Sequence, residues 1–114
     1  MLIKIITEPI TRAEALEIGQ EFYGEMIKGV IDLEREIIAL GGEYHMDANN
    51  ILLADGSSQP DIWGFNIHPK LESEEWIEYT SLINIRPQAG NRTMVIEDEG
   101  LKSKIREIIE KLVK

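Results

Sequence analysis

The sequence predicts an α+β domain of two layers, in which a long N-terminal helix and a C-terminal helix cover one face of a mainly antiparallel sheet. Two observations predict this class. Helical periodicity occurs near both ends of the 114-residue chain, and strand-like runs cluster between them. Strands that are grouped in sequence tend to pair antiparallel, with helices packed on one side. The length fits a single domain, residues 1–114.

The N-terminal half is expected to contain one strand and one long helix. The run Leu2 to Ile6 is rich in β-branched residues and predicts a strand. Thr11 and Glu14 have the spacing of a capping box, which predicts the start of a helix. This helix is expected from Arg12 to Leu40, because apolar residues recur along it in alternating steps of four and three: Met26, Val30, Leu33, Ile37 and Leu40. A break near Gly24 into two helices is the alternative, since an internal glycine costs up to ~1 kcal/mol.

The middle of the chain is expected to be β structure. The runs "EYHM" and "ILLA" read as short strands around the turn "DANN", and Asp61 to Ile67 reads as a further strand. The longest strand signal runs from Glu75 to Arg86, and Pro87 ends it because proline has no N–H to donate. The last element is a helix from Glu99 to Val113 with one apolar face, which begins after the N-cap candidate Asp98.

Composition restricts the possible functions. The chain carries 12 basic and 21 acidic side chains, a net charge of −9 and no cysteine. An acidic protein repels phosphate backbones, so nucleic acid is not an expected partner. Without cysteine there are no disulfides and no thiolate zinc sites, and no cofactor is predicted. The first apolar run is too short for a signal peptide or a membrane span, so we expect a cytoplasmic protein without membrane contact.

A polar face of the predicted sheet is the first candidate site. Alternate side chains of a strand point to opposite faces, so the strand predictions place five polar residues together: His45, Asp47, Asn66, Glu78 and Asn84. Gly64 in mid-strand leaves this face open to a ligand or to another stretch of backbone. Some of these side chains can bind metals, but no metal-ligand motif is present and no metal site is predicted. Solvated strand residues are the alternative interpretation.

The segment "RPQAGNR" is the second candidate site. Arg86 and Arg92 flank a turn at Gly90 and Asn91, whose main-chain N–H groups could join the guanidinium groups in binding a carboxylate or phosphate. The alternative is an ion pair between Arg86 and a nearby acid such as Glu78. Because 21 acidic side chains are available, this structural role is the expected one.

Two classes of function remain. The first is a small cytoplasmic binding or interaction domain without catalytic activity, whose small-molecule ligand is unknown. A homodimer is expected, because the predicted long helix has more large apolar residues than one side of a small core can bury. The second class is a small enzyme that uses the polar sheet face, either a metal-assisted hydrolase or an anion-binding enzyme. The lack of a catalytic motif favours the binding domain.

Four stretches carry a resemblance to a known family: Gly42 to His45, Asp55 to Ser57, Asp61 to Asn66, and Ile85 to Arg92. With them, nearly the whole sequence resembles a small prokaryotic family known only as domain of unknown function 5674. The resemblance implies a free-standing domain. It implies no activity, cofactor or catalytic residue.

Overall fold

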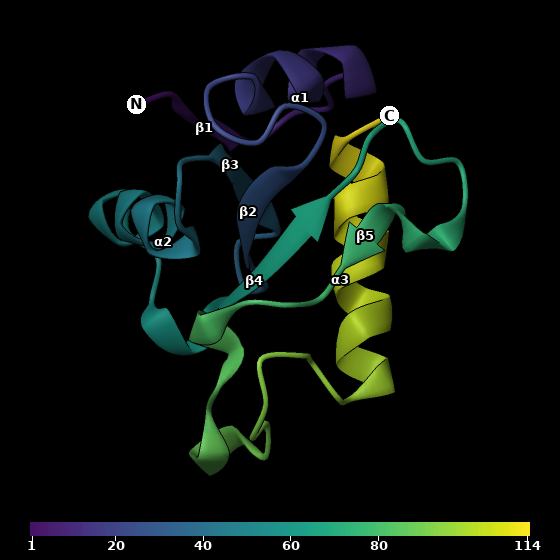
Figure 1. Ribbon diagram of the computed structural model, residues 1–114. Helices are drawn as coiled ribbons and strands as arrows, with labels where there is room; N and C mark the ends of the chain where they lie inside the picture. The colour runs from purple at the N-terminus through teal and green to yellow at the C-terminus, as the bar shows by residue number, and fades with distance from the viewer.

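The computed structural model describes residues 1–114 and contains one five-stranded sheet and three α-helices (Figure 1). The strand order is β1-β3-β2-β4-β5, and every neighbouring pair is antiparallel. The mixed α+β class and the antiparallel sheet are therefore confirmed. The elements in chain order are β1 (Ile3–Ile6), α1 (Arg12–Gly19), β2 (Ile27–Asp32), β3 (Ile37–Gly41), α2 (His45–Ala54), β4 (Ile62–Ile67), β5 (Ile77–Glu78) and α3 (Glu99–Leu112).

The N-terminal helix is short, and the prediction of a helix from Arg12 to Leu40 is wrong. Its start is as predicted: the Thr11 hydroxyl accepts from the Glu14 N–H at 3.0 Å, and the Glu14 carboxylate accepts from the Thr11 N–H at 3.2 Å. The helix ends at Gly19, and Gly24 has a φ of 69°, a backbone conformation that glycine adopts without strain. The alternative of a second helix after Gly24 is wrong too, because a strand follows.

The stretch from 27 to 41 forms the β-hairpin of β2 and β3, with Asp32 paired to Ile37 across the turn. The Asp32 carboxylate accepts from the N–H groups of Glu34 and Arg35, at 2.9 and 3.1 Å, and so orders this turn. Both strands are buried on both faces, so they lack the alternation that identifies a half-exposed strand. Their dense apolar spacing therefore matches a helical pattern as well as a strand pattern.

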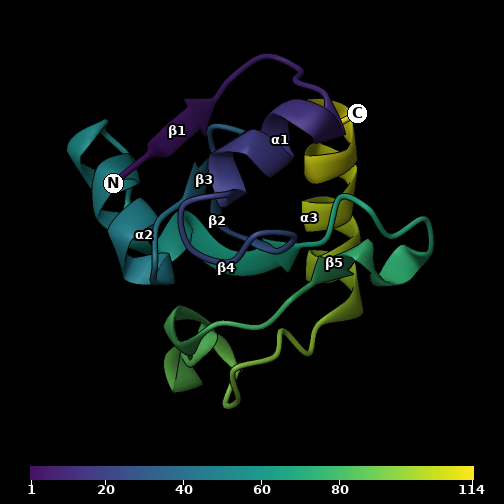
Figure 2. The ribbon, with the colours of Figure 1, turned by 45° about the horizontal axis from the view of Figure 1, so that its top comes forward.

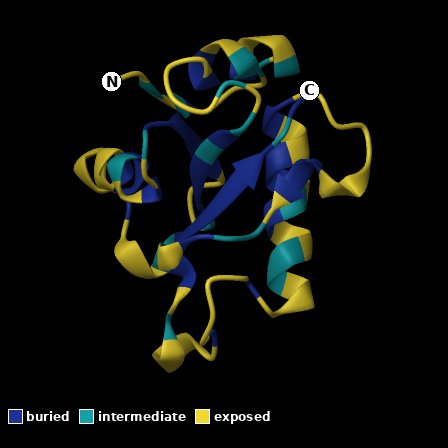
Figure 3. Ribbon diagram, viewed as in Figure 1, coloured by how far each residue is buried: buried dark blue, intermediate teal, exposed yellow.

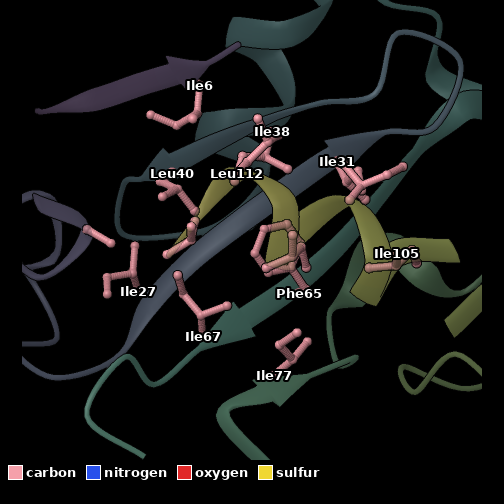
Figure 4. Packing of buried hydrophobic residues seen from close by; sticks show 14 of the residues in the cluster. Ile6, Ile27, Ile31, Ile38, Leu40, Phe65, Ile67, Ile77, Ile105 and Leu112 are labelled. Atoms are coloured by element: carbon pink, nitrogen blue, oxygen red, sulfur yellow. The ribbon is translucent and has the colours of Figure 1, made fainter. Parts of the chain in front are cut away.

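Helices α1 and α3 pack on one face of the sheet, where eighteen buried residues form the larger core. Figure 4 shows Phe65 of β4 in this core, with Ile31 from β2, Leu40 from β3 and Ile105 from α3. A Cβ added to Gly29 would lie 2.5 Å from the Phe65 ring, so the absence of a side chain there lets the ring pack against the sheet.

Helix α2 packs on the opposite face, in a smaller core with Val30 of β2 and Ala39 of β3. Figures 1 and 2 show the sheet between α2 and α3, so the two-layer prediction is wrong. The prediction of strands and a turn in this segment is also wrong. The helix begins here because the Asp47 carboxylate accepts from the N–H groups of Glu43 and Tyr44 at 3.1 and 2.9 Å, which stabilises the first turn.

The long strand predicted from Glu75 to Arg86 is mostly absent. Only Ile77 and Glu78 pair with β4, and the chain then leaves the sheet through short 3₁₀ turns, the first at Leu82–Asn84. Residues 79–96 are here called the 79–96 segment. Its residues Ser81, Ile83 and Asn84 pack beside β4 on the same face as α2, whereas Tyr79 and Ile96 at its ends contact the larger core. Figure 3 shows the sheet as the buried centre of the molecule and much of this segment as exposed.

Candidate functional site

A cavity of about 430 Å³ lies between the start of α2 and the 79–96 segment, over β2 and β4. We call it the His45 cavity. Half of its ten lining residues are apolar, and none is acidic. The strands contribute Lys28 and Asn66, the start of α2 contributes Tyr44, His45 and Met46, and the 79–96 segment contributes Thr80, Ser81, Leu82, Ile83 and Met94.

His45 is the first residue of α2, and its side chain is buried with 8% of its surface exposed. Its Nε2 lies 2.8 Å from the carbonyl oxygen of Phe65. Because a carbonyl can only accept, Nε2 carries a hydrogen and donates it. Burial lowers the pKa of His45 below its ordinary 6.5, Lys28 adds to this, and the interactions with Phe65 and Asn66 oppose it. At neutral pH the ring is therefore neutral, with a lone pair on Nδ1.

Asn66 of β4 brings a buried amide to the same cavity, with 7% of its surface exposed. Its Nδ2 donates to the carbonyl oxygen of Thr80 at 3.4 Å, which sets the orientation of the amide. Its Oδ1 is buried and has no hydrogen-bond partner within the chain. A buried acceptor without a donor costs about 1–3 kcal/mol, so a donor brought by a ligand would relieve this cost.

Lys28 of β2 adds a positive charge to the cavity. Its side chain is partly buried and forms no ion pair, in a chain with 21 acidic residues. Its ammonium group lies over the ring of Tyr23, 5.1 Å from the centroid. A cation and a titratable imidazole therefore line a cavity without any carboxylate.

The other residues of the predicted polar face lie elsewhere. Asp47 stabilises the start of α2, as described above. The Glu78 carboxylate lies 2.8 Å from Nε2 of His68 in an exposed pair at the end of β5. Asn84 is fully buried and binds the main chain of Gly64. The structure thus brings His45 and Asn66 together in the cavity. Glu78 is paired with Asn66 across β4 and β5, but neither it nor Asp47 or Asn84 lines the cavity.

Gly64 faces the chain itself. A Cβ at this position would lie 2.5 Å from the Cβ of Ser81 and 3.1 Å from Cγ1 of Ile83. The opening that the sequence predicts in this strand is therefore filled by the 79–96 segment. This close approach places the wall of the His45 cavity against the sheet.

Arg86 binds main-chain carbonyl groups and not the carboxylate of Glu78. Its guanidinium donates to the carbonyl oxygens of Pro60, Ile62 and Ile83, at 3.1 Å from Nη1 to Pro60 and 3.3 Å from Nε to Ile83. The group also lies 4.4 Å from the centroid of the Trp63 ring. Burial lowers the pKa of Arg86, and Asp61 opposes this shift. These contacts give Arg86 a structural role.

The rest of the predicted anion loop is occupied by its own hydrogen bonds. The Gly90 N–H donates to the carbonyl oxygen of Pro87 at 3.0 Å, and the Asn91 N–H donates to that of Arg86 at 3.1 Å. The Asn91 side chain points inward and donates to three carbonyl groups, those of residues 84, 93 and 95. Arg92 is exposed and does not line the pocket of about 440 Å³ beside Arg86.

Sequence reasoning missed most of the His45 cavity. The sequence pattern predicts a helix at Lys28 and strands at Met46 and Leu82, so it does not bring these residues together. One available signal was Asp47, which stands three residues after Tyr44, as the acid of a helix start does. It predicts α2 and with it the position of His45 at a helix N-terminus.

The comparisons with known proteins identify a family and no activity. No curated protein and no solved structure matches the chain. No helix in the structure has the length and apolar character needed to span a membrane. The model of the family described as protein of unknown function, DUF5674, matches residues 4–112. The match covers nearly the whole chain, which therefore belongs to the DUF5674 family.

Proposed function

We propose that the protein is a binding domain without catalytic activity, and that its ligand occupies the His45 cavity. The observation that carries the proposal is the cavity itself. Its volume of about 430 Å³ lies within the range of small-molecule sites, which are mostly apolar with a few convergent polar groups. Here Met46 and Met94 belong to the apolar walls, and Lys28, His45 and Asn66 are polar groups contributed by the sheet and α2.

The placement of the predicted catalytic residues supports binding over metal-assisted hydrolysis. Such an enzyme would need His45, Asp47 and Glu78 around one ion. Instead His45 donates to Phe65, Asp47 accepts from the first turn of α2, and Glu78 pairs with His68. No group of three or more His, Cys, Asp or Glu side chains is arranged to hold a metal ion. We also propose a cytoplasmic location, which the absence of cysteine supports.

The methionines offer a direct test of the proposal. The chain has four, of which Met46 and Met94 line the cavity from α2 and from the 79–96 segment, whereas Met1 and Met26 lie outside it. Protein labelled with ¹³C at the methionine methyl groups should be screened by NMR against small apolar and amphiphilic fragments. Binding should shift the Met46 and Met94 signals and leave the Met1 signal in place. A screen in which no fragment shifts Met46 and Met94 together would contradict the proposal.

Self-association is a second candidate, favoured by exposed apolar residues at the mouth of the cavity. Leu82 is 72% exposed, and Tyr44 and Met94, which also line the cavity, are exposed as well. The predicted long helix with its surplus of apolar residues does not support a dimer, because most apolar residues from 27 to 40 are buried within the sheet. Light scattering during size exclusion tests the candidate. A dimer has twice the chain mass of 13.0 kDa, and a monomer at tens of micromolar contradicts it.

A further inference from the structure

We infer that the His45 cavity takes an amphiphilic anion, an apolar chain or ring that carries one carboxylate, with the charged group beside Lys28 and His45. The inference rests on the binding function proposed above and names the chemical class of its ligand. Three features carry it: the charge of the lining, the surroundings of the His45 ring, and the exposed apolar residues at the mouth.

The lining is positive in a strongly acidic protein. The chain has 21 acidic side chains and a net charge of −9, yet the ten residues around the cavity include a lysine, a histidine and no acid. Some other cations of this chain form ion pairs with acids, as Arg35 does with Asp55 and Lys70 with Glu25. Lys28 is partly buried and has no such partner. A ligand carboxylate would supply the missing counter-ion and gain a charge-assisted hydrogen bond.

The surroundings of His45 suit the imidazolium that an anion would favour. The Phe65 carbonyl and the Asn66 side chain interact with the ring, and the neutral ring uses its one N–H on Phe65, which leaves Asn66 Oδ1 without a donor. A protonated ring has a second N–H, which Oδ1 could accept. His45 also stands at the N-terminus of the ten-residue helix α2, where anions are stabilised. Binding of the anion should therefore be accompanied by proton uptake at His45.

The other charged and titratable groups near His45 fit this account. Lys28 faces it from β2. Tyr44 lines the cavity from the start of α2, and Glu43 raises the pKa of Tyr44, so the phenol is neutral at physiological pH. The Asp47 carboxylate is hydrogen-bonded to main-chain N–H groups and does not line the cavity. The 79–96 segment adds no titratable group to the lining.

Apolar side chains at the mouth of the cavity can contact the apolar part of the ligand. Leu82 and Met94 from the 79–96 segment and Met46 from α2 line the cavity and are exposed at the same time. Methionine and leucine side chains adapt to linear and cyclic hydrocarbon groups. A ligand with a hydrocarbon portion would bury these side chains while its carboxylate reached Lys28.

Three probes with the same hydrocarbon chain test the ligand class: octanoate, 1-octanol and octylammonium. Each is titrated into the whole protein at neutral pH, with calorimetry for the affinity and the methionine methyl signals for the location. Octanoate should bind at least about tenfold more tightly than octanol, and octylammonium most weakly, with shifts at Met46 and Met94. Equal binding of octanoate and octanol, or stronger binding of octylammonium, would overturn the inference and leave the proposed function standing. If no probe shifts Met46 and Met94, the proposed function fails as well.

Two variants separate the roles of the charged groups. Lys28→Met should lower the affinity for octanoate about tenfold and leave the affinity for octanol unchanged. Lys4→Met makes the same charge change at an exposed position of β1 and should leave both affinities unchanged. The affinity of the wild-type protein for octanoate should rise as the pH falls from about 7.5 to about 6, by at most about tenfold per pH unit. In His45→Gln this rise should be absent. If Lys28→Met behaves like Lys4→Met, or if the rise persists in His45→Gln, the assignment of the charged group to this end of the cavity is overturned.

Discussion

The side chain of Asn84 takes the place of a neighbouring strand at Gly64. Its Oδ1 accepts from the Gly64 N–H at 2.8 Å, and its Nδ2 donates to the Gly64 carbonyl oxygen at 3.0 Å. Arg86 binds the carbonyl oxygen of Ile62 in the same strand. Strand β5 pairs only with the last two residues of β4, so these side chains satisfy main-chain groups that β5 does not reach. They also hold the 79–96 segment, and thus one wall of the His45 cavity, against the sheet.

Replacing Asn84 should destabilise the fold strongly. Asn84→Ala removes the two hydrogen bonds to Gly64 and the longer ones to the carbonyl oxygens of Tyr79 and Met94. It leaves the buried N–H and C=O of Gly64 without partners, which should lower the free energy of unfolding by roughly 2–4 kcal/mol. Urea unfolding followed by circular dichroism measures the change. Asn50→Ala is the matched control, because Asn50 is exposed on α2 and alanine favours helices. If the two variants unfold at similar urea concentrations, the role assigned to Asn84 is wrong.

Gly64 and Ser81 should be energetically coupled. Gly64→Ala places a Cβ 2.5 Å from the Cβ of Ser81, an overpacking that should cost about 1–3 kcal/mol of unfolding free energy. Ser81→Gly removes the clashing atoms at a cost of its own. The double variant should lose less unfolding free energy than the two single variants together, by about 1 kcal/mol or more. Simple additivity would contradict the close approach of the 79–96 segment to β4.

Arg86 should behave as a structural residue. Arg86→Ala removes the contacts with Pro60, Ile62 and the Trp63 ring. The free energy of unfolding should fall by about 2 kcal/mol, which is measured as a lower melting temperature. Arg86→Lys should restore little of the loss, because an ammonium group cannot reproduce the planar fork. Added phosphate or citrate should stabilise wild type and Arg86→Ala equally. Protection of the wild type alone would instead support an anion site in this loop.

His45 should make stability depend on pH. Its pKa in the folded state lies below the 6.5 of the unfolded chain, because burial opposes the charged form. The unfolded state therefore binds more protons, and the stability contributed by neutral His45 is present above about pH 6.5 and lost as the pH falls through the folded pKa. Urea unfolding at a series of pH values should show this loss in wild type and a smaller one in His45→Gln. Parallel curves for the two proteins would show that His45 is not buried as a neutral ring.

The elements that the sequence predicts correctly are those with local signals. Thr11 and Glu14 start α1, Asp98 accepts from the Gly100 N–H at the start of α3, and β-branched and aromatic residues identify β4. The hairpin of β2 and β3 has no such signal, because both of its faces are buried and the usual alternation is lost. The path of the 79–96 segment depends on contacts of Asn84 and Arg86 with β4, which are distant in sequence.

The candidate site could be predicted only in part for the same reason. Strand parity predicts that His45 and Asn66 share a face; both line the cavity, although His45 reaches it from a helix. Lys28 could not be included, because its place depends on the register that pairs it with Asn66 in β4. The apolar residues Leu82 and Met94 come to the cavity through the non-local fold of the 79–96 segment.

A crystallographic screen with small amphiphilic fragments, octanoate among them, tests the central claim most directly, namely that the His45 cavity is the binding site. We expect electron density for bound fragments between α2 and the 79–96 segment, with apolar groups against Met46 and Met94 and the octanoate carboxylate beside Lys28. Fragments found only elsewhere, for example in the pocket of Arg86 and Gln88, with the His45 cavity unoccupied at high fragment concentration, would contradict the account.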